Sequence, residues 1–439
     1  MSANTSNIKV KHAQSVIKHS ISNYGNLGIG LTKKQRPSDI KSLLTTITYL
    51  DHNSTTPVNS CVLEEMIPLF DVIFGNPSND NHQYGHGANA RIEYARGQVA
   101  SITGMSASDV LFTSGATESN NMALRGIAEG CDKRATMLVG TTEHKSILET
   151  AKRLEELDLA KIVTVPADSN GVILPESLSK AISEHGADIV SIMAANSETG
   201  VIHPTKELAR VAHDAGALFH CDATQALGRI PFDATEMGVD MVSLSGHKMY
   251  GPKGVGALVA NRRARKALRA VTLGGGQEGG LRSGTPNVPG IVGLGKACEI
   301  AAAEGIADGP RQAGLRDRLE RLLADGLPGV TVNGAGAPRL PNTSSVRFEG
   351  AMSYATIANA PAVAISSGSA CSSSTIEPSH VLLAMGLSDT EADETVRISL
   401  GRPTTTGDIE RAAEHIIAAV RRVRGLEGTG PQAMEAATP

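Results

Sequence analysis

A lysine in a glycine-flanked turn is the first feature of the sequence that could carry chemistry. Lys248 follows His247 in Ser243-Leu-Ser-Gly-His-Lys-Met-Tyr-Gly, directly after an apolar run that predicts a buried strand. A partly desolvated lysine loses its proton more easily and can then form a Schiff base. Ser245 and His247 could donate hydrogen bonds to a phosphate beside it. The alternative is a solvated surface lysine, and Lys253, in a neighbouring Gly-Pro-Lys-Gly turn, is the competing candidate.

A carboxylate ends a second expected strand. Asp222 lies in Phe219-His-Cys-Asp-Ala-Thr-Gln225, and α/β sheets bind ligands at the carboxyl ends of their strands. A carboxylate there can pair with a protonated pyridine nitrogen, which makes the ring of pyridoxal 5'-phosphate (PLP) an electron sink. Gln225 could reach the phenolic oxygen of the same ring. The alternative role for Asp222 is an ordinary helix N-cap.

Two further segments suit the phosphate and the ring of such a cofactor. The run from Leu111 to Asn120 predicts a strand, a glycine turn and a helix beginning near Thr117. Free N–H groups at a helix start bind phosphate, although ordinary Ser/Thr capping would give the same pattern. His144 follows the expected strand Met137–Thr141 and could stack on the ring and shuttle protons. A lone histidine is more often a partly buried structural residue.

A cysteine and an arginine in the last quarter of the chain could act on a substrate. Cys371 lies in Ser366-Ser-Gly-Ser-Ala-Cys-Ser-Ser-Ser374, where small neighbours suit a nucleophile that must travel. Arg397 lies in an expected strand and shares one face of it with Ser399. An arginine fork is a natural clamp for a substrate α-carboxylate. The alternative for Arg397 is a salt bridge between domains.

Alternating strands and helices must position these residues. Apolar runs predict strands, and polar amphipathic stretches between them predict helices, such as 118–129 and 206–215; the expected strands are Val110–Phe112, Thr136–Val139, Ile189–Met193, Leu218–Cys221 and Met241–Leu244. This order predicts an α/β protein with a mostly parallel sheet. We expect a large cofactor domain over residues 63–295 and a smaller α+β domain formed by 48–62 and 296–424. Residues 1–47 would be a flexible extension and 425–439 a disordered tail.

Composition limits the class of protein further. The chain has 439 residues, 41% of them hydrophobic, and a net charge of −4, so neither nucleic acid nor an anionic membrane is an expected direct partner. No apolar run reaches the length of a membrane span. The five cysteines form no CxxC pair, which argues against a metal site or disulfides and favours a reducing compartment. The extension is basic and leaves mitochondrial targeting open beside a cytoplasmic location. No P-loop follows a strand.

Taken together, the order of the segments resembles the cysteine desulfurases of the NifS/IscS type, which are fold-type I PLP-dependent transferases. The resemblance runs from Tyr49 to about Val423. Besides the segments above, it includes Tyr49-Leu-Asp-His-Asn-Ser-Thr-Thr-Pro57, Gly75-Asn-Pro-Ser78 with His82, Val190-Ser-Ile-Met-Ala-Ala-Asn-Ser-Glu-Thr-Gly200 and Gly274-Gly-Gly-Gln-Glu278 leading to Arg282-Ser-Gly-Thr285.

The resemblance implies a role for each residue. Lys248 would hold PLP as a Schiff base, Asp222 would pair with the pyridine nitrogen and Cys371 would receive sulfur. The remaining matches are His144 on the ring, Gln225 at the phenolic oxygen, Ser197 beside the ring, Ala116, Thr117, Ser245 and His247 at the phosphate, and Asn196 and Arg397 at the substrate. Thr285 matches a phosphate contact from the other subunit, so a homodimer is expected.

The implied activity converts L-cysteine to L-alanine, leaves a persulfide on Cys371 and passes its sulfur to an acceptor protein. Ser197 stands where the family often has asparagine, which puts the contact with substrate in doubt. The segment after Arg424 lacks the end with which housekeeping members bind an iron–sulfur scaffold. Iron–sulfur assembly, tRNA thiolation and DNA phosphorothioation therefore all stay open, and the unlike tail favours the last.

Two rival classes keep parts of the same pattern. Another PLP enzyme of this fold, such as an aminotransferase or a selenocysteine lyase, would use Lys248 and Asp222 but give Cys371 no duty. A non-enzymatic scaffold that binds sulfur-carrier proteins would need none of these residues, so their presence argues against it. Release of alanine without a keto acid separates a desulfurase from an aminotransferase.

Overall fold

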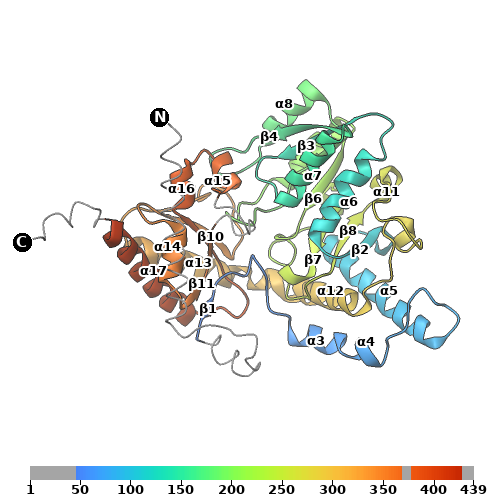
Figure 1. The fold of residues 1–439 in the computed structure, drawn as a ribbon, viewed down its shortest axis with the longest axis horizontal. Helices are drawn as coiled ribbons and strands as arrows, with labels where there is room; N and C mark the ends of the chain where they lie inside the picture. The colour runs from blue at the N-terminus through green and yellow to red at the C-terminus, as the bar shows by residue number, and fades with distance from the viewer. Residues whose placement is uncertain (1–45, 368–376, 428–439) are drawn as a thin grey trace, which may run out of the picture.

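A seven-stranded sheet forms the centre of the larger of two parts seen side by side in Figure 1. The computed structural model describes residues 46–367 and 377–427. The strand order is β2-β8-β7-β6-β5-β3-β4, and all strands run parallel except β8, which is antiparallel to both neighbours. The strands are β2 (Val110–Thr113), β3 (Ala135–Gly140), β4 (Ala160–Val165), β5 (Ile189–Ser191), β6 (Leu218–Asp222), β7 (Met241–Ser245) and β8 (Gly256–Ala260). All five strands expected from the apolar runs are present.

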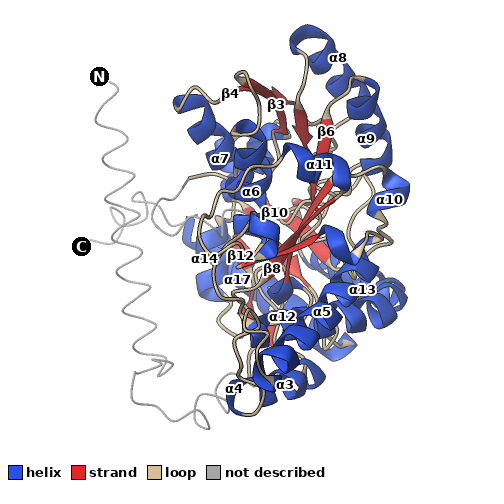
Figure 2. Ribbon diagram, turned by 90° about the vertical axis from the view of Figure 1, so that its right-hand side faces the viewer, coloured by secondary structure: helices blue, strands red, loops and turns tan. Residues whose placement is uncertain are grey.

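Helices cover both faces of this sheet (Figure 2). One face packs against α5 (Gln83–Thr103), α8 (Pro175–His185), α9 (Thr205–Asp214) and α12 (Val288–Ile300). The other packs against α6 (Ala116–Ala128), α7 (Lys145–Glu156) and α11 (Arg262–Ala267). Shorter helices are α3 (Ser60–Met66), α4 (Pro68–Asp71) and α10 (Ala234–Met237). The expected α/β class with a mostly parallel sheet is therefore confirmed.

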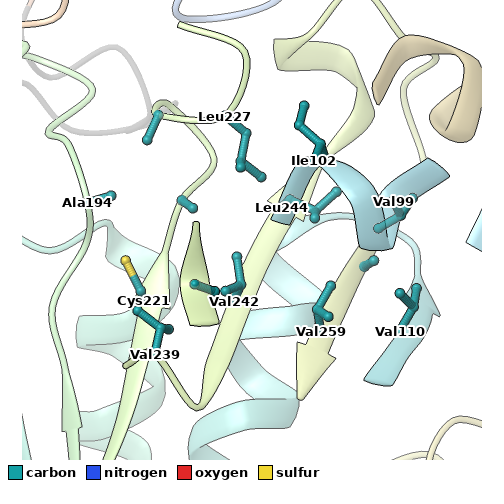
Figure 3. Packing of buried hydrophobic residues seen from close by; sticks show 14 of the residues in the cluster. Val99, Ile102, Val110, Ala194, Cys221, Leu227, Val239, Val242, Leu244 and Val259 are labelled. Carbon is teal, nitrogen blue, oxygen red and sulfur yellow. The ribbon is translucent and has the colours of Figure 1, made fainter. Parts of the chain in front are cut away.

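Strand β6 shows how the sequence assigns residues to the two faces. Successive side chains of a strand point to opposite sides. Phe219 and Cys221 join the core cluster on the α5 side together with Val242 and Leu244 of β7, as Figure 3 shows for the last three. Asp222, the next residue, ends the strand on the other side. The same strand thus anchors the core and presents a carboxylate at its carboxyl end.

The smaller part is an α+β layer built on an antiparallel sheet, β12-β13-β10-β9. Its strands are β9 (Val330–Val332), β10 (Thr343–Phe348), β12 (Ser366–Ser367) and β13 (Thr395–Ser399), and β1 (Thr48–Tyr49) pairs with β11 (Val363–Ala364) beside them. Its helices are α13 (Ile306–Gly326), α14 (Ser353–Asn359), α15 (His380–Ala384), α16 (Asp389–Asp393) and α17 (Thr406–Glu427). Leucine and isoleucine side chains of α13 and α17 fill the core of this part.

The two parts are joined by continuous helix. α12 runs through the π turn Ala301–Gly305 into α13, and α12 itself packs on α3 and α5 of the larger part. The expected boundary between residues 295 and 296 lies inside α12 and remains a proposal. α17 continues to Glu427, so the first three residues of the expected tail are helical. Residues 1–45 and 428–439 lie outside the described residues, and within the described chain no helix is long and apolar enough to cross a membrane.

Candidate active site

A cavity of about 580 Å³ opens at the carboxyl ends of β2, β6 and β7. Segments from both parts of the molecule line it. It brings together ten of the residues singled out from the sequence: Ala116, Thr117, His144, Ser197, Asp222, Gln225, Ser245, His247, Lys248 and Arg397. The sheet therefore gathers into one space residues that are up to 281 positions apart, from Ala116 to Arg397.

Lys248 reaches this cavity from the short 3₁₀ turn Gly246–Lys248, directly after β7. Its Nζ donates to the carbonyl oxygens of Asn53 at 2.5 Å and Ser54 at 2.8 Å. Both acceptors belong to the segment after β1. Lys253 also borders the cavity but lies at its exposed rim. The polar surroundings of Lys248 favour it as the functional lysine.

Asp222 is buried, with 7% of its surface exposed, and both carboxylate oxygens accept hydrogen bonds. Asn120 Nδ2 donates to Oδ2 at 2.8 Å, and the backbone N–H of Thr224 donates to Oδ1 at 2.9 Å. These two donors hold the carboxylate in a fixed orientation. Asp222 closes a turn at the end of β6 and caps no helix, so the N-cap alternative does not describe it.

His144 is the N-cap of α7 and also lines the cavity. Its Nδ1 accepts the backbone N–H of Ser146 at 3.1 Å. Burial lowers the pKa of His144, with Lys248 among the nearby positive charges that add to the effect. The ring is therefore neutral at physiological pH, which suits stacking on an aromatic ring.

The start of α6 lines one part of the cavity. Gly115, the N-cap, has a φ of 152°, a conformation that side chains rarely adopt. A Cβ on Gly256 of β8 would lie 2.6 Å from Gly115 Cα, so two glycines let the strand and the turn approach. The first N–H groups of a helix have no partner within it, so those of Ala116 and Thr117 can bind a phosphate.

His247 also lines the cavity. Burial lowers the pKa of its imidazole to about 4, with Lys248 and Lys253 adding to the effect. Its Nδ1 lies 3.2 Å from Thr55 Oγ1, in the segment after β1. A neutral histidine retains one N–H donor.

Arg397 reaches the cavity from β13 of the smaller part, and its side chain is 4% exposed. Its Nη2 donates to Asp51 Oδ1 at 2.8 Å and Ser54 Oγ at 2.6 Å, while Nη1 donates to the Ser197 carbonyl at 3.3 Å. Within the described residues, its buried Nε has no hydrogen-bond partner. Arg397 thus lines the cavity and is ion-paired, but Asp51 bridges to Ser399 of β13 within the smaller part, so this salt bridge does not join the two parts.

A second cavity of about 220 Å³ adjoins the first, and the two share His144, Met193, Ser197 and Arg397. Asn196 lines only this second cavity. Its Nδ2 donates to the Thr142 carbonyl at 2.9 Å, and its Oδ1 accepts the N–H groups of Glu198 and Thr199. Its amide is therefore occupied in shaping the turn that carries Ser197.

Gln225 and Thr285 are placed differently from each other. Gln225 lines the first cavity, with Nε2 donating to the Asn53 carbonyl at 3.1 Å and Oε1 accepting from Arg229. Thr285 lines a smaller cavity of about 120 Å³ with Phe112 and Arg282, which adjoins the first cavity at Ser114 and Gly254. It does not border the 580 Å³ cavity of its own chain.

Cys371 lies outside the described residues, but both described flanks of its segment lie at the site. Ser366 of β12 pairs with Arg397 of β13. On the other side, Glu377, Ser379 and His380 line the second cavity. The described residues on both sides of 368–376 thus lie close to Arg397 and the second cavity.

The four described cysteines are poor alternatives to Cys371, since none lines either cavity. Burial raises the pKa of Cys221 well above its usual value and that of Cys298 to about 12, so both are protonated thiols. Burial also raises the pKa of Cys131, and Cys61 is exposed on α3. Among the described residues, no group of three or more His, Cys, Asp or Glu side chains could hold a metal ion.

The donor set fits PLP. A helix start with free N–H groups matches its phosphate, the buried carboxylate of Asp222 matches its ring nitrogen, and Lys248 matches its aldehyde. Thr224 Oγ1, which lines the cavity and is buried without a partner among the described residues, supplies one more polar contact.

The resemblance included the segment after β1, but sequence reasoning gave its residues no role in the site. Asn53, Ser54 and Thr55 line the cavity, and the first two hold Lys248 through their carbonyl groups. The signal was the polar run Asp51-His-Asn-Ser-Thr-Thr56, which follows a two-residue strand. Met193, Ala195 and Thr224 were also missed, because an apolar or hydroxyl residue next to a strand end carries no chemical signal of its own.

Comparison with known proteins agrees with this site. The family model of class-V aminotransferases matches residues 48–412. The cysteine desulfurase IscS of Anaeromyxobacter sp. (strain Fw109-5) is 45% identical over 86% of this chain and 93% of its own length, and the probable mitochondrial cysteine desulfurase of Dictyostelium discoideum is 41% identical over 86% and 84%. A solved NifS-like protein aligns with a TM-score of 0.79 at 37% identity, covering 86% of this chain and all of that one.

The fold and the site thus define a PLP-dependent enzyme of fold type I. The chain belongs to the class-V aminotransferase family and, within it, to the PLP-dependent cysteine desulfurases of the NifS/IscS type. The resemblance inferred from the sequence, the cofactor and the enzyme class are confirmed.

Proposed function

We propose that the 580 Å³ cavity converts L-cysteine to L-alanine, with Lys248 holding PLP and Cys371 receiving the sulfur. The observation that carries this assignment is the meeting of the two parts at one point. Lys248 of the larger part and Arg397 of the smaller part line the same cavity, and β12, which leads to the Cys371 segment, pairs with Arg397. A lysine, a carboxylate clamp and an approaching thiol are what this reaction requires.

PLP, when bound, supplies a carbonyl for the substrate amino group and a ring that withdraws electrons. The chain supplies the rest. Arg397 holds the α-carboxylate, and Lys248 removes the Cα proton. The Asp222 carboxylate would pair with the ring nitrogen, and the neutral His144 would lie against the ring.

The Cys371 thiolate attacks the substrate sulfur. The substrate C–S bond breaks as the new S–S bond forms, so Cys371 becomes a persulfide and the former Cβ, after taking up a proton, becomes the methyl group of alanine. Lys248 returns a proton to Cα, and the substrate sulfur is oxidised to the persulfide level as Cβ is reduced, so atoms and electrons balance.

The homodimer and the identity of the sulfur acceptor are also proposals. Thr285 borders a cavity other than its own chain's active site, which suits a contact with the cofactor of a second copy in a homodimer. An acceptor of iron–sulfur assembly is the first to test, because relatives named IscS match at up to 45% identity. Acceptors of tRNA thiolation and of DNA phosphorothioation should be tested in parallel as the alternatives. Relatives include mitochondrial and mitosomal proteins, and a cytoplasmic location stays a prediction.

The decisive experiment replaces Cys371. We expect Cys371→Ser to bind PLP and L-cysteine but to lose alanine release by at least about 100-fold in a single turnover, because a hydroxyl is a far poorer nucleophile toward sulfur. Mass spectrometry should find the added sulfur on Cys371 of the unmodified chain. Cys61→Ser, which replaces an exposed thiol away from the cavity, is the matched control. Near-normal alanine release by Cys371→Ser would rule out the persulfide route and favour a lyase.

A further inference from the structure

Two buried polar residues connect His144 with Asp222 behind the cavity. Asn120 of α6 is fully buried, and its Nδ2 lies 2.8 Å from Asp222 Oδ2 and 2.8 Å from Ser146 Oγ. Ser146 Oγ in turn lies 2.8 Å from His144 Nδ1. Neither Asn120 nor Ser146 lines the cavity, so neither would be found from its lining.

The chemistry of the end groups fixes the direction of these hydrogen bonds. An ionised carboxylate only accepts, so the Asn120 atom facing Asp222 is the NH₂ group. That group has two hydrogens, one for Asp222 and one for Ser146 Oγ. The Asn120 oxygen is left buried without a partner among the described residues, which is the cost of this orientation.

The other end of the connection is fixed by the backbone. The N–H of Ser146 donates to His144 Nδ1 at 3.1 Å, and a backbone N–H cannot accept. His144 Nδ1 therefore carries no proton, and the Ser146 hydroxyl also donates to it. A neutral imidazole has one proton, which must then lie on Nε2.

We infer that Asn120 and Ser146 are positioning residues that join Asp222 to His144 through a chain of hydrogen bonds donated in both directions from the Asn120 amide, and that the backbone N–H and the hydroxyl of Ser146 together hold His144 as the Nε2–H tautomer. The inference rests on the proposed function and refines it. It fixes both the orientation of the ring and which edge can donate.

This arrangement limits what His144 can do during the reaction. The lone pair of Nδ1 accepts hydrogen bonds from Ser146, and Nε2 carries the proton. The neutral ring therefore donates from Nε2 and has no nitrogen left to accept a proton from the substrate. Neutral His144 therefore orients ring and substrate, and the Cα proton goes to Lys248. Burial, which lowers the pKa of His144, keeps the imidazole in the neutral form that the chain requires.

The tautomer can be observed directly. The PLP-loaded full-length protein, labelled with [¹⁵N]histidine, would be studied by long-range ¹H–¹⁵N correlation, and His144→Gln would identify the signals among 13 histidines. We expect a protonated, pyrrole-type Nε2 and an unprotonated, pyridine-type Nδ1. A proton on Nδ1, or fast exchange between the two tautomers, would overturn the inference.

Two variants test the chain itself. Ser146→Ala removes the hydroxyl but keeps the backbone donor, and we expect the Nδ1 signal to shift toward that of a free pyridine-type nitrogen and kcat to fall about fivefold, as for one lost hydrogen bond. Ser146→Thr should restore both. Asn120→Leu should shift the same Nδ1 signal although Asn120 makes no contact with His144. If Asn120→Leu does not fold, the variants Ser146→Ala and Ser146→Thr still test the inference.

Thr150→Val is the matched control, because Thr150 Oγ1 donates to the Ser146 carbonyl on the same helix without joining the chain. It should leave the His144 signals unchanged. An Nδ1 signal that Ser146→Ala does not move would sink the inference while leaving the desulfurase proposal intact. Absence of alanine and persulfide in the unmodified protein would instead sink the proposed function, whatever the tautomer.

Discussion

The two sides of strands β6 and β7 differ sharply although the strands are buried throughout. On the α5 side, Phe219, Cys221, Val242 and Leu244 belong to one apolar cluster, part of which Figure 3 shows. On the α6 side, the same strands carry His220, Asp222, Ser243 and Ser245, all of them buried polar residues. Residues next to each other in the sequence therefore differ in role: one packs in the apolar core, and the next provides a polar group on the opposite side.

Hydrogen bonds connect His220 on this polar side to serines of both neighbouring strands. His220 Nδ1 lies 2.9 Å from Ser191 Oγ on β5, and its Nε2 lies 2.9 Å from Ser243 Oγ on β7. This ladder crosses three adjacent strands below Asp222. A buried polar group without partners would cost free energy, so the ladder lets the sheet hold a carboxylate near the cavity. We expect substitutions on the polar side to change chemistry or pH response and those on the apolar side to change stability.

The largest expected effect lies just beyond the polar end of β7. Lys248→Ala should lose covalently bound PLP and reduce alanine production by at least about 1,000-fold, because the Schiff base and the base for the Cα proton are both removed. Lys253→Ala should retain the cofactor, since Lys253 lies at the exposed rim. Borohydride reduction followed by peptide mapping checks the attachment point. A label on Lys253 would reverse the assignment.

The next effect concerns Asp222 on the polar side of β6. Asp222→Ala should keep part of its PLP, because the α6 and Lys248 contacts remain, but lose about 100-fold or more in kcat, as is typical when a buried charge that stabilises the reacting system is removed. Absorbance of bound cofactor and steady-state alanine release measure the two effects separately. Full activity would mean that Asp222 serves only the turn that follows β6.

Much of the architecture was predictable because the spacing of apolar residues and the positions of strand ends can be read from short stretches of sequence. Alternation of apolar runs with helical stretches gave the strands around Val139, Phe219 and Val242 to within two residues of their ends. The positions of Asp222 and Lys248 after buried strands also placed them at one edge of a parallel sheet. These inferences needed no knowledge of distant contacts.

The rest of the site depends on contacts between distant segments. Nothing local to Asn53 says that its carbonyl will accept from Lys248, 195 residues away. Asn120 was assigned to the phosphate turn by its sequence, whereas its amide instead joins Asp222 and Ser146. A salt bridge was one interpretation of Arg397, but its partner Asp51 could not be named, because the two residues are 346 positions apart.

A moderate effect should appear in the pH dependence of stability. Burial lowers the pKa of His220 to about 4, whereas in the unfolded chain it is near 6.5. The unfolded chain therefore binds a proton first as pH falls, so the stability is fully present above about pH 6.5 and decreases toward pH 4, by up to about 3 kcal/mol for this group. His220→Gln, which offers a neutral donor and acceptor to the two serines, should reduce this decrease.

Thermal midpoints measured between pH 7 and pH 4.5 would test this. The decrease should not vanish in His220→Gln, because burial lowers the pKa of His52 and of His203 to about 4 as well. His415→Gln, on the exposed side of α17, is the control and should follow the unmodified protein. An unchanged slope in His220→Gln would show that the ladder does not hold a neutral histidine.

The smallest effect is expected one residue along the strand, at Cys221. It adjoins Asp222 in sequence but points into the apolar cluster, and burial raises its pKa well above the usual value for a thiol. Cys221→Ala should cost about 1 kcal/mol of stability through lost packing and leave alanine production and PLP binding unchanged. Cys221→Ser should cost more, because its hydroxyl would enter an apolar cluster without a partner. Urea denaturation and single-turnover alanine release measure the two properties. A large loss of activity in Cys221→Ala, with stability nearly intact, would show that the two sides of β6 are coupled and would break the division of labour between them.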